Sequence, residues 1–102
     1  MEHTERLFVY GTLRRPSVQK TVFGRTTRGV PDMLRRYRRS ILTIKSIPYP
    51  VAVRSRSGRI QGSVLEVAKR ELKKIDRYET RAYKRKRLVL ESGVLAWVFV
   101  RA

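Results

Sequence analysis

Glu79 is the residue of this sequence whose position best suits proton-transfer chemistry. Ala68, Leu72 and Ile75 recur at intervals of four and three residues, which predicts an amphipathic helix over residues 68–78. Continuing the spacing by four places Glu79 on the apolar face, at the C-terminal end of the helix. Burial and the negative end of the helix dipole both disfavour an ionised carboxylate there. We therefore expect a raised pKa for Glu79, toward the range in which a carboxyl group works as a general base or acid.

Four cations lie near Glu79 in the sequence and allow a second interpretation: Arg77, Arg81, Lys84 and Arg85. If one of them pairs with Glu79 at the surface, the pKa of the carboxyl falls and the residue is structural. The helix periodicity alone leaves both interpretations open.

The segment Tyr10-Gly11-Thr12-Leu13 is the second candidate for chemistry. Residues 7–10 favour a strand, and Gly11 allows the backbone to turn sharply, for which we expect a positive φ. A strand that ends in a turn of exposed amides can hold a small anion. The alternative is a strand that simply runs into a loop.

Composition excludes several kinds of catalytic site. The sequence has no cysteine and one histidine, His3. We therefore expect no thiolate chemistry, no Cys/His zinc site, no other metal and no cofactor. The 102 residues predict a single domain, residues 1–102. No apolar run is long enough to span a membrane, and the N-terminal residues do not resemble a signal peptide, so we expect a cytoplasmic protein.

Net charge is the most unusual property of the chain. Lys and Arg number 25 against 8 Asp and Glu, a formal charge of +17. Most of these cations have no carboxylate partner and must face water or anions. Basic clusters occur at residues 34–40, 69–74 and 83–87, and Tyr37 lies between arginine pairs, as aromatic residues do on single-strand-binding surfaces. Because no familiar nucleic-acid motif occurs, the charge predicts weak nucleic-acid binding at most.

The elements that must position the candidate residues are mostly strands. The hydrophobic pattern predicts strands at residues 6–10, 39–46, 51–54, 59–67, 85–91 and 94–100. Ser57-Gly58 and Ser92-Gly93 predict turns, the second within a two-residue hairpin, and residues 94–100 predict a central, buried strand. Between the first two strands we expect one helical turn at residues 18–23 and a short helix that begins at Pro31 and runs through Tyr37.

Four motifs together resemble a known family. They are FVYGTL at residues 8–13, IPYPVAV at 47–53, IQGSVLEV at 60–67 and LKKIDRYETRAYKRKRLVL at 72–90. In this order they resemble the γ-glutamylcyclotransferase-like family, also called the AIG2-like family, from about Arg6 to the final strand. The resemblance implies an α+β fold, a small mixed β-barrel of about six strands with one clear flanking helix.

The resemblance also implies a reaction, in which a γ-glutamyl amine or peptide is cyclised to 5-oxoproline and the amine is released. The α-amino nitrogen of the substrate attacks its own γ-carbonyl group, so the enzyme supplies no nucleophile. Glu79 matches the catalytic carboxylate of the family and would act as base and then as acid.

Substrate-binding residues are implied in the same way. Residues 10–13 match a turn whose backbone amides would hold the glutamyl part, with Gly11 allowing a close approach. Tyr49 and Tyr83 fall in matching motifs and would line the pocket. The alternative for each is a tyrosine at the edge of the core with a satisfied hydroxyl group.

The sequence departs from the family pattern beside both motifs. Arg14, Arg15 and Pro16 follow the turn where many relatives have a glycine, and Thr80 follows Glu79 where a glycine is common. The identity of the released amine and the oligomeric state are therefore left open. Two other functions remain for the same fold: a nucleic-acid- or ribosome-binding protein, and a binder of small carboxylates without catalysis.

Overall fold

Apolar residues alternate along the first strand and give the sheet two buried faces. The computed structural model describes residues 3–79 and 81–102, and its first strand, β1, covers Thr4–Val9. Leu7 and Val9 pack on the side that the helices cover, whereas Phe8 packs on the concave side. β1 therefore lies in the middle of the fold, with a core on each side.

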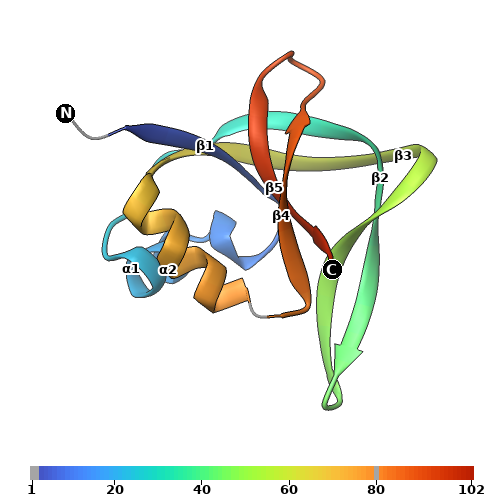
Figure 1. The fold of residues 1–102 in the computed structure, drawn as a ribbon, viewed down its shortest axis with the longest axis horizontal. Helices are drawn as coiled ribbons and strands as arrows, with labels where there is room; N and C mark the ends of the chain where they lie inside the picture. The colour runs from blue at the N-terminus through green and yellow to red at the C-terminus, as the bar shows by residue number, and fades with distance from the viewer. Residues whose placement is uncertain (1–2, 80) are drawn as a thin grey trace.

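Five strands form one mixed sheet that curls into a half-barrel (Figure 1). The others are β2 (Val30–Ile44), β3 (Ile47–Ala68), β4 (Tyr83–Val89) and β5 (Leu95–Arg101). Their order is β2-β3-β1-β5-β4; β1 and β5 are parallel, and the other neighbours are antiparallel. The predicted α+β class is confirmed, with five strands in place of about six.

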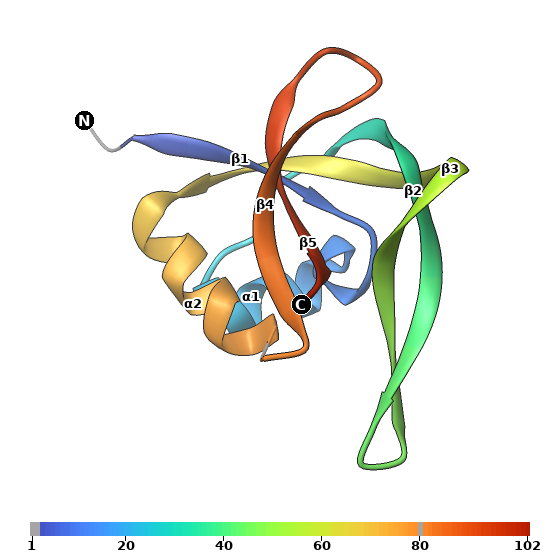
Figure 2. The same cartoon turned by 45° about the vertical axis from the view of Figure 1, so that its right-hand side comes forward.

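Two α-helices, α1 (Pro16–Phe23) and α2 (Lys69–Glu79), pack against one face of the sheet (Figure 2). Leu72 and Ile75 of α2 are buried in that interface, as their spacing predicted. The single helical turn expected at residues 18–23 is the full helix α1, which follows a short 3-10 helix, η1 (Thr12–Arg14). No helix in the described part of the chain is long and apolar enough to cross a membrane.

The helix predicted to begin at Pro31 is wrong, because β2 covers this segment. β2 is an edge strand, where a residue without an N–H group is tolerated. Its pairing with β3 shifts register at Arg36, which has a φ of 68°. The shift reverses the alternation of inward and outward side chains, so Leu34 and Tyr37 are both buried although they are three residues apart. Their spacing therefore imitates a helix.

The turn predicted at Ser57-Gly58 is also wrong, because β3 continues through these residues. Gly58 lies where the two long strands pack closely: a Cβ atom on it would be 2.4 Å from the carbonyl oxygen of Tyr37. The glycine serves this close approach and not a chain reversal. The three strands predicted at residues 39–46, 51–54 and 59–67 consequently belong to two strands.

The hairpin predicted at Ser92-Gly93 is confirmed between β4 and β5, but the predicted two-residue loop is wrong. Its loop has three residues, because the amide of Leu90 donates to the carbonyl of Val94 at 2.8 Å. Gly93 has a φ of 94°, the conformation that a three-residue hairpin loop requires. β5 lies inside the sheet between β1 and β4, as its apolar sequence predicted.

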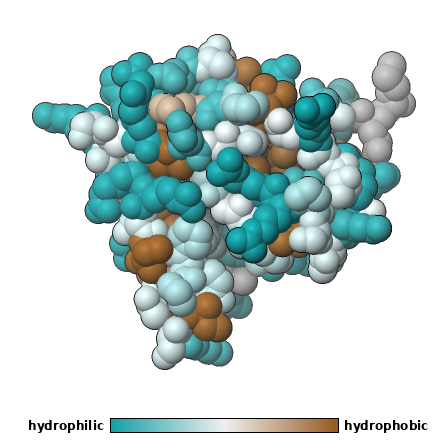
Figure 3. All heavy atoms as spheres, turned by 180° about the vertical axis from the view of Figure 1, so that it is seen from behind, coloured by the Kyte–Doolittle hydropathy of each residue, from teal (hydrophilic) through white to brown (hydrophobic). Residues whose placement is uncertain are grey.

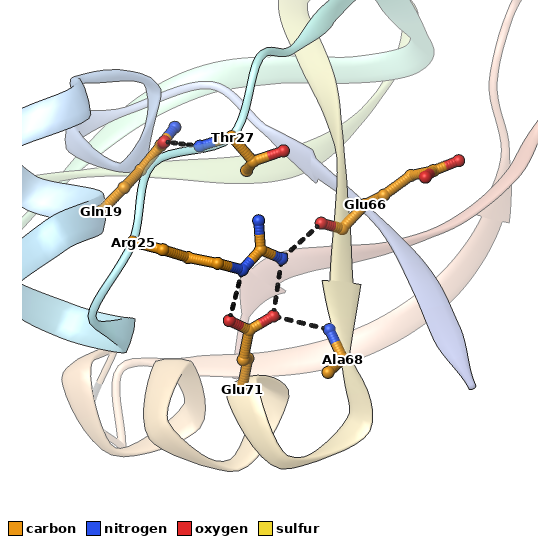
Figure 4. A network of polar contacts seen from close by, with 6 residues as sticks. All are labelled: Gln19, Arg25, Thr27, Glu66, Ala68 and Glu71. Carbon is orange, nitrogen blue, oxygen red and sulfur yellow. Dashed lines mark hydrogen bonds and ion pairs between the residues drawn. The ribbon is translucent and has the colours of Figure 1, made fainter. Parts of the chain in front are cut away.

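A buried carboxylate joins the start of α2 to the chain that follows α1 (Figure 4). Glu71 accepts two hydrogen bonds from Arg25, each 2.8 Å long, and one from the amide of Ala68 at 2.7 Å. Arg25 also donates to the carbonyl oxygen of Glu66 at the end of β3. Burial pushes the pKa of Glu71 upward, but these donors hold it below its ordinary value. The carboxylate therefore stays ionised inside the fold.

We expect Glu71→Ala to destabilise the protein by roughly 2 to 4 kcal/mol, because Arg25 and the Ala68 amide lose their acceptor. The matched control is Glu66→Ala, which removes an exposed carboxylate and keeps the backbone carbonyl that Arg25 uses; it should change stability by less than about 0.5 kcal/mol. Urea unfolding measures both. Equal costs for the two variants would contradict the structural role of Glu71.

Candidate active site

A cavity of about 430 Å³ opens where the end of β1, η1 and the end of α2 meet the β2–β3 hairpin. Its lining residues are Phe8, Val9, Tyr10, Gly11, Thr12, Leu13, Pro48, Tyr49, Pro50, Tyr78, Glu79, Tyr83 and Phe99. Glu79, the turn at residues 10–13, Tyr49 and Tyr83 all belong to this set. The structure thus brings together every residue that the sequence suggested as part of a site.

Glu79 is the last residue of α2 and contributes the one carboxyl group among the lining residues. Burial raises its pKa from 4.5 to about 7. No ion pair between described residues involves Glu79. Arg85, a cation near it in the sequence, instead holds Asp76, with 2.6 Å between Nε and Oδ1. Of the two interpretations that the sequence left open, the structure favours a buried carboxyl group that can titrate near neutral pH.

The turn after β1 reaches the cavity in a conformation that differs from the expected one. Gly11 has a φ of −128°, so the positive φ is wrong. A Cβ atom on Gly11 would lie 3.7 Å from Cγ of Pro50, an ordinary contact, so close approach does not require glycine here. A side chain at Gly11 would instead occupy space beside Pro50, in the cavity wall.

The backbone of η1 provides donors at the same place. The amides of Arg14 and Arg15 close the turn by donating to Gly11 and Thr12, at 3.1 and 2.9 Å. In a 3-10 helix the preceding amides have no acceptor within the helix. Thr12 and Leu13 line the cavity, and their amides donate no hydrogen bond within the turn itself.

Two tyrosines of the cavity wall donate their hydroxyl hydrogens to the backbone. Tyr10 donates to the carbonyl of Phe99, and Tyr83 donates to the carbonyl of Pro50. Burial raises the pKa of Tyr83 to about 12 and that of Tyr10 as well, so both stay protonated at neutral pH. For Tyr83 the two interpretations are not exclusive. Its hydroxyl group has a hydrogen-bond partner, and the residue also lines the cavity.

Sequence reasoning missed other lining residues, of which Tyr78 is the most informative. Its hydroxyl group lies 2.8 Å from Oγ1 of Thr12 and so joins α2 to η1 beside the cavity. The sequence feature that could have indicated Tyr78 as a lining residue is its position directly before Glu79 at the end of the helix. Nothing in the local pattern indicated Phe99, which reaches the cavity only because β5 pairs with β1.

Among the described residues, the lining holds one carboxyl group and no lysine, arginine or histidine, in a chain with 25 lysines and arginines. Among residues 3–79 and 81–102, no group of three or more acidic or histidine side chains is placed to hold a metal ion. What this arrangement can do chemically is bind a small molecule against aromatic and proline side chains and move a proton through Glu79.

Sequence comparison identifies relatives of this chain. The family model described as gamma-glutamyl cyclotransferase, AIG2-like, matches residues 7–102. Protein AIG2 C of Arabidopsis thaliana is 36% identical over 83 residues, which are 80% of this chain and 49% of that protein. The chain thus spans about half the length of this curated relative.

Solved structures show the same fold. One Arabidopsis thaliana protein, solved in solution, superposes with a TM-score of 0.80 at 31% identity, over 99% of this chain and 64% of that one. A second solution structure from the same plant gives a TM-score of 0.80 at 28% identity, over 96% of this chain and 68% of the other. The half-barrel with two helices is therefore shared with both.

The raised pKa of Glu79 predicts that this residue costs stability at alkaline pH. Its pKa is about 7 in the folded protein against 4.5 for the free side chain. The contribution of Glu79 to the free energy of unfolding is therefore complete below pH 4.5 and is lost as the pH rises through about 7. Glu79→Gln, which does not titrate, should therefore be more stable than the native protein at about pH 8, by roughly 2 to 3 kcal/mol.

Urea unfolding at about pH 5 and about pH 8 measures this difference, and Glu66→Gln is the exposed control. We expect the advantage of Glu79→Gln to shrink at the lower pH. An advantage of the same size at both pH values would contradict the raised pKa.

Proposed function

Because the chain belongs to the gamma-glutamyl cyclotransferase, AIG2-like family, we propose that it cyclises a γ-glutamyl amine or peptide to 5-oxoproline and releases the amine. The observation that carries the proposal is the buried carboxyl group of Glu79, with its pKa of about 7. A group with this pKa exists in both protonation states at neutral pH. It can therefore accept a proton in one step and donate one in the next.

The reaction needs proton transfer and positioning but no nucleophile from the protein. Ionised Glu79 accepts a proton from the α-ammonium group of the substrate, and the freed amino nitrogen attacks the γ-carbonyl carbon to close a five-membered ring. The attacking nitrogen then loses a second proton, the leaving nitrogen is protonated, and its bond to the carbonyl carbon breaks. In all, two protons move from the first nitrogen to the second, and Glu79 ends ionised as it began.

The walls of the cavity support the positioning that this chemistry requires. The amides of Thr12 and Leu13 are donors suited to the carboxylate of the glutamyl part or to the developing oxyanion. The hydroxyl groups of Tyr10 and Tyr83 have donated their hydrogens elsewhere, so their oxygens are left to accept from an ammonium group near Glu79. Holding the attacking nitrogen close to the γ-carbonyl carbon lowers the activation barrier of the cyclisation by several kcal/mol.

Besides nucleic-acid binding, one competing function on this fold is a binder of small carboxylates without catalysis. Such a protein has no need of a titrating acid, and an exposed, ion-paired Glu79 would have suited it. The buried Glu79 without an ion pair in the described part of the chain favours the enzyme.

We expect the native protein to release 5-oxoproline from at least one member of a panel of γ-glutamyl amides and peptides. Glu79→Gln keeps the shape of the side chain and removes the proton-transferring group, so release should fall by about a thousandfold or more. The control is Asp76→Asn, which removes a carboxylate of the same helix that does not line the cavity. A native protein that releases nothing from any substrate, or a Glu79→Gln variant with full activity, would refute the proposal.

The pKa of Glu79 also predicts the pH dependence of the reaction. Because the ionised form starts the reaction, kcat/KM should rise as the pH increases and level off above about 7. Initial rates at low substrate concentration over a range of pH measure this profile. An acidic limb centred near 4.5, the value of an exposed glutamate, would show that Glu79 is not the base.

A further inference from the structure

Six exposed arginines gather where the paired strands β2 and β3 bend. They are Arg35, Arg36, Arg38, Arg54, Arg56 and Arg59, and we call this set the arginine corner. The bend lies at the right of Figure 1, and hydrophilic side chains cover the corresponding upper left of Figure 3. The sequence showed the cluster at residues 34–40, but not that β3 adds three more arginines to it.

The strand register forces these like charges together. Arg35 lies directly opposite Arg59, and a cross-strand pair of equal charge is unfavourable. Antiparallel pairing on both sides of the register shift holds the two strands together despite the repulsion. The arginine corner is therefore a fixed concentration of positive charge.

Among the described residues, Glu91 is the one carboxylate that forms ion pairs with the arginine corner. Oε1 of Glu91 lies 2.9 Å from Nη2 of Arg59 and 4.0 Å from Nε of Arg35. The ion pairs of the described residues include none of the other four arginines of the corner. An anion that contacts them would gain favourable charge interactions without first displacing a protein carboxylate.

The basic cluster at residues 83–87 differs, since its arginines are already engaged. Arg85 pairs with Asp76 and Arg87 pairs with Glu5. Both guanidinium groups also lie over the ring of Trp97, at 4.5 and 4.7 Å from its centre. The arginines of the corner are therefore less engaged by protein acceptors than those of the cluster at residues 83–87.

We propose that the arginine corner binds the phosphodiester backbone of a nucleic acid. The planar guanidinium group pairs with phosphate oxygens through two parallel hydrogen bonds. The strand register places Arg35 and Arg59 on one face of the paired strands and Arg54 on the face of Tyr37, so the corner presents such groups on both sides of the bend. Binding is independent of base sequence, because the expected stacking residue, Tyr37, is only 6% exposed and cannot receive bases.

A nucleic acid fits this surface better than a membrane does. Surface binding to lipid combines basic side chains with apolar side chains that enter the bilayer. The exposed large apolar residues of the described chain lie outside the arginine corner, at Val30, Ile41, Ile47, Tyr78, Val89 and Leu95. The corner itself offers charge and hydrogen-bond donors only.

The test compares two variants that lose the same charge. The corner variant changes Arg36, Arg38, Arg54 and Arg56 to Gln, and the control variant changes Lys69, Lys73, Lys74 and Lys84 to Gln. Binding of a labelled single-stranded RNA, and of a DNA duplex of equal length, is measured over a range of salt concentrations. Circular dichroism establishes that each variant is folded, and Arg54→Gln with Arg56→Gln is the smaller variant to use if the full set does not fold.

We expect the native protein to lose affinity steeply with salt. The slope of log K against log salt should be shallower by about 3 in the corner variant, because each lost phosphate contact lowers it by about 0.7 to 0.9. The control variant should keep most of the native slope. Equal losses in both variants would show that net charge alone attracts the nucleic acid and would overturn the proposal. So would binding to vesicles of anionic lipid that depends on the corner when RNA and DNA binding do not.

Discussion

The ionised carboxylate of Glu71 fixes where α2 begins, and the candidate site depends on that start. Its bonds to Arg25 and to the Ala68 amide tie the first turn of the helix to the end of β3 and to the chain after α1. With its first turn held and Leu72 and Ile75 packed on the sheet, α2 has little freedom to rotate. Glu79, two turns further along the helix, is consequently directed to the cavity.

Buried Glu71 and partly buried Glu79 of α2 differ in how the fold treats their charge. Glu71 has enough hydrogen-bond donors to remain charged, whereas no ion pair between described residues involves Glu79 and burial raises its pKa. The described residues that line the cavity include no cation, and the guanidinium group of Arg39 lies over the ring of Tyr10 at 5.9 Å from its centre. None of the arginines of the corner is among these lining residues.

Local patterns predicted the parts of the fold that depend on local interactions. The helix face identified Glu79, and the apolar run at residues 94–100 identified an interior strand. Predictions failed where a neighbouring strand decides the conformation: the shift at Arg36 gives β2 a helical spacing, and Gly58 serves packing and not a turn. Phe99 enters the cavity through a pairing of distant strands, which no local pattern encodes.

The parallel pairing of β1 with β5 has a consequence for how the protein acquires its cavity during synthesis. The hydroxyl group of Tyr10 finds its acceptor on Phe99, 89 residues later in the chain. On the ribosome, β1 and the turn after it emerge early, and the part of the cavity wall formed by Tyr10 and Phe99 can form only after β5 has been synthesised. Long-range pairings of this kind form slowly, because a large loop must be ordered first. The cavity wall is thus completed late in folding, after the β2–β3 hairpin and α2 are available.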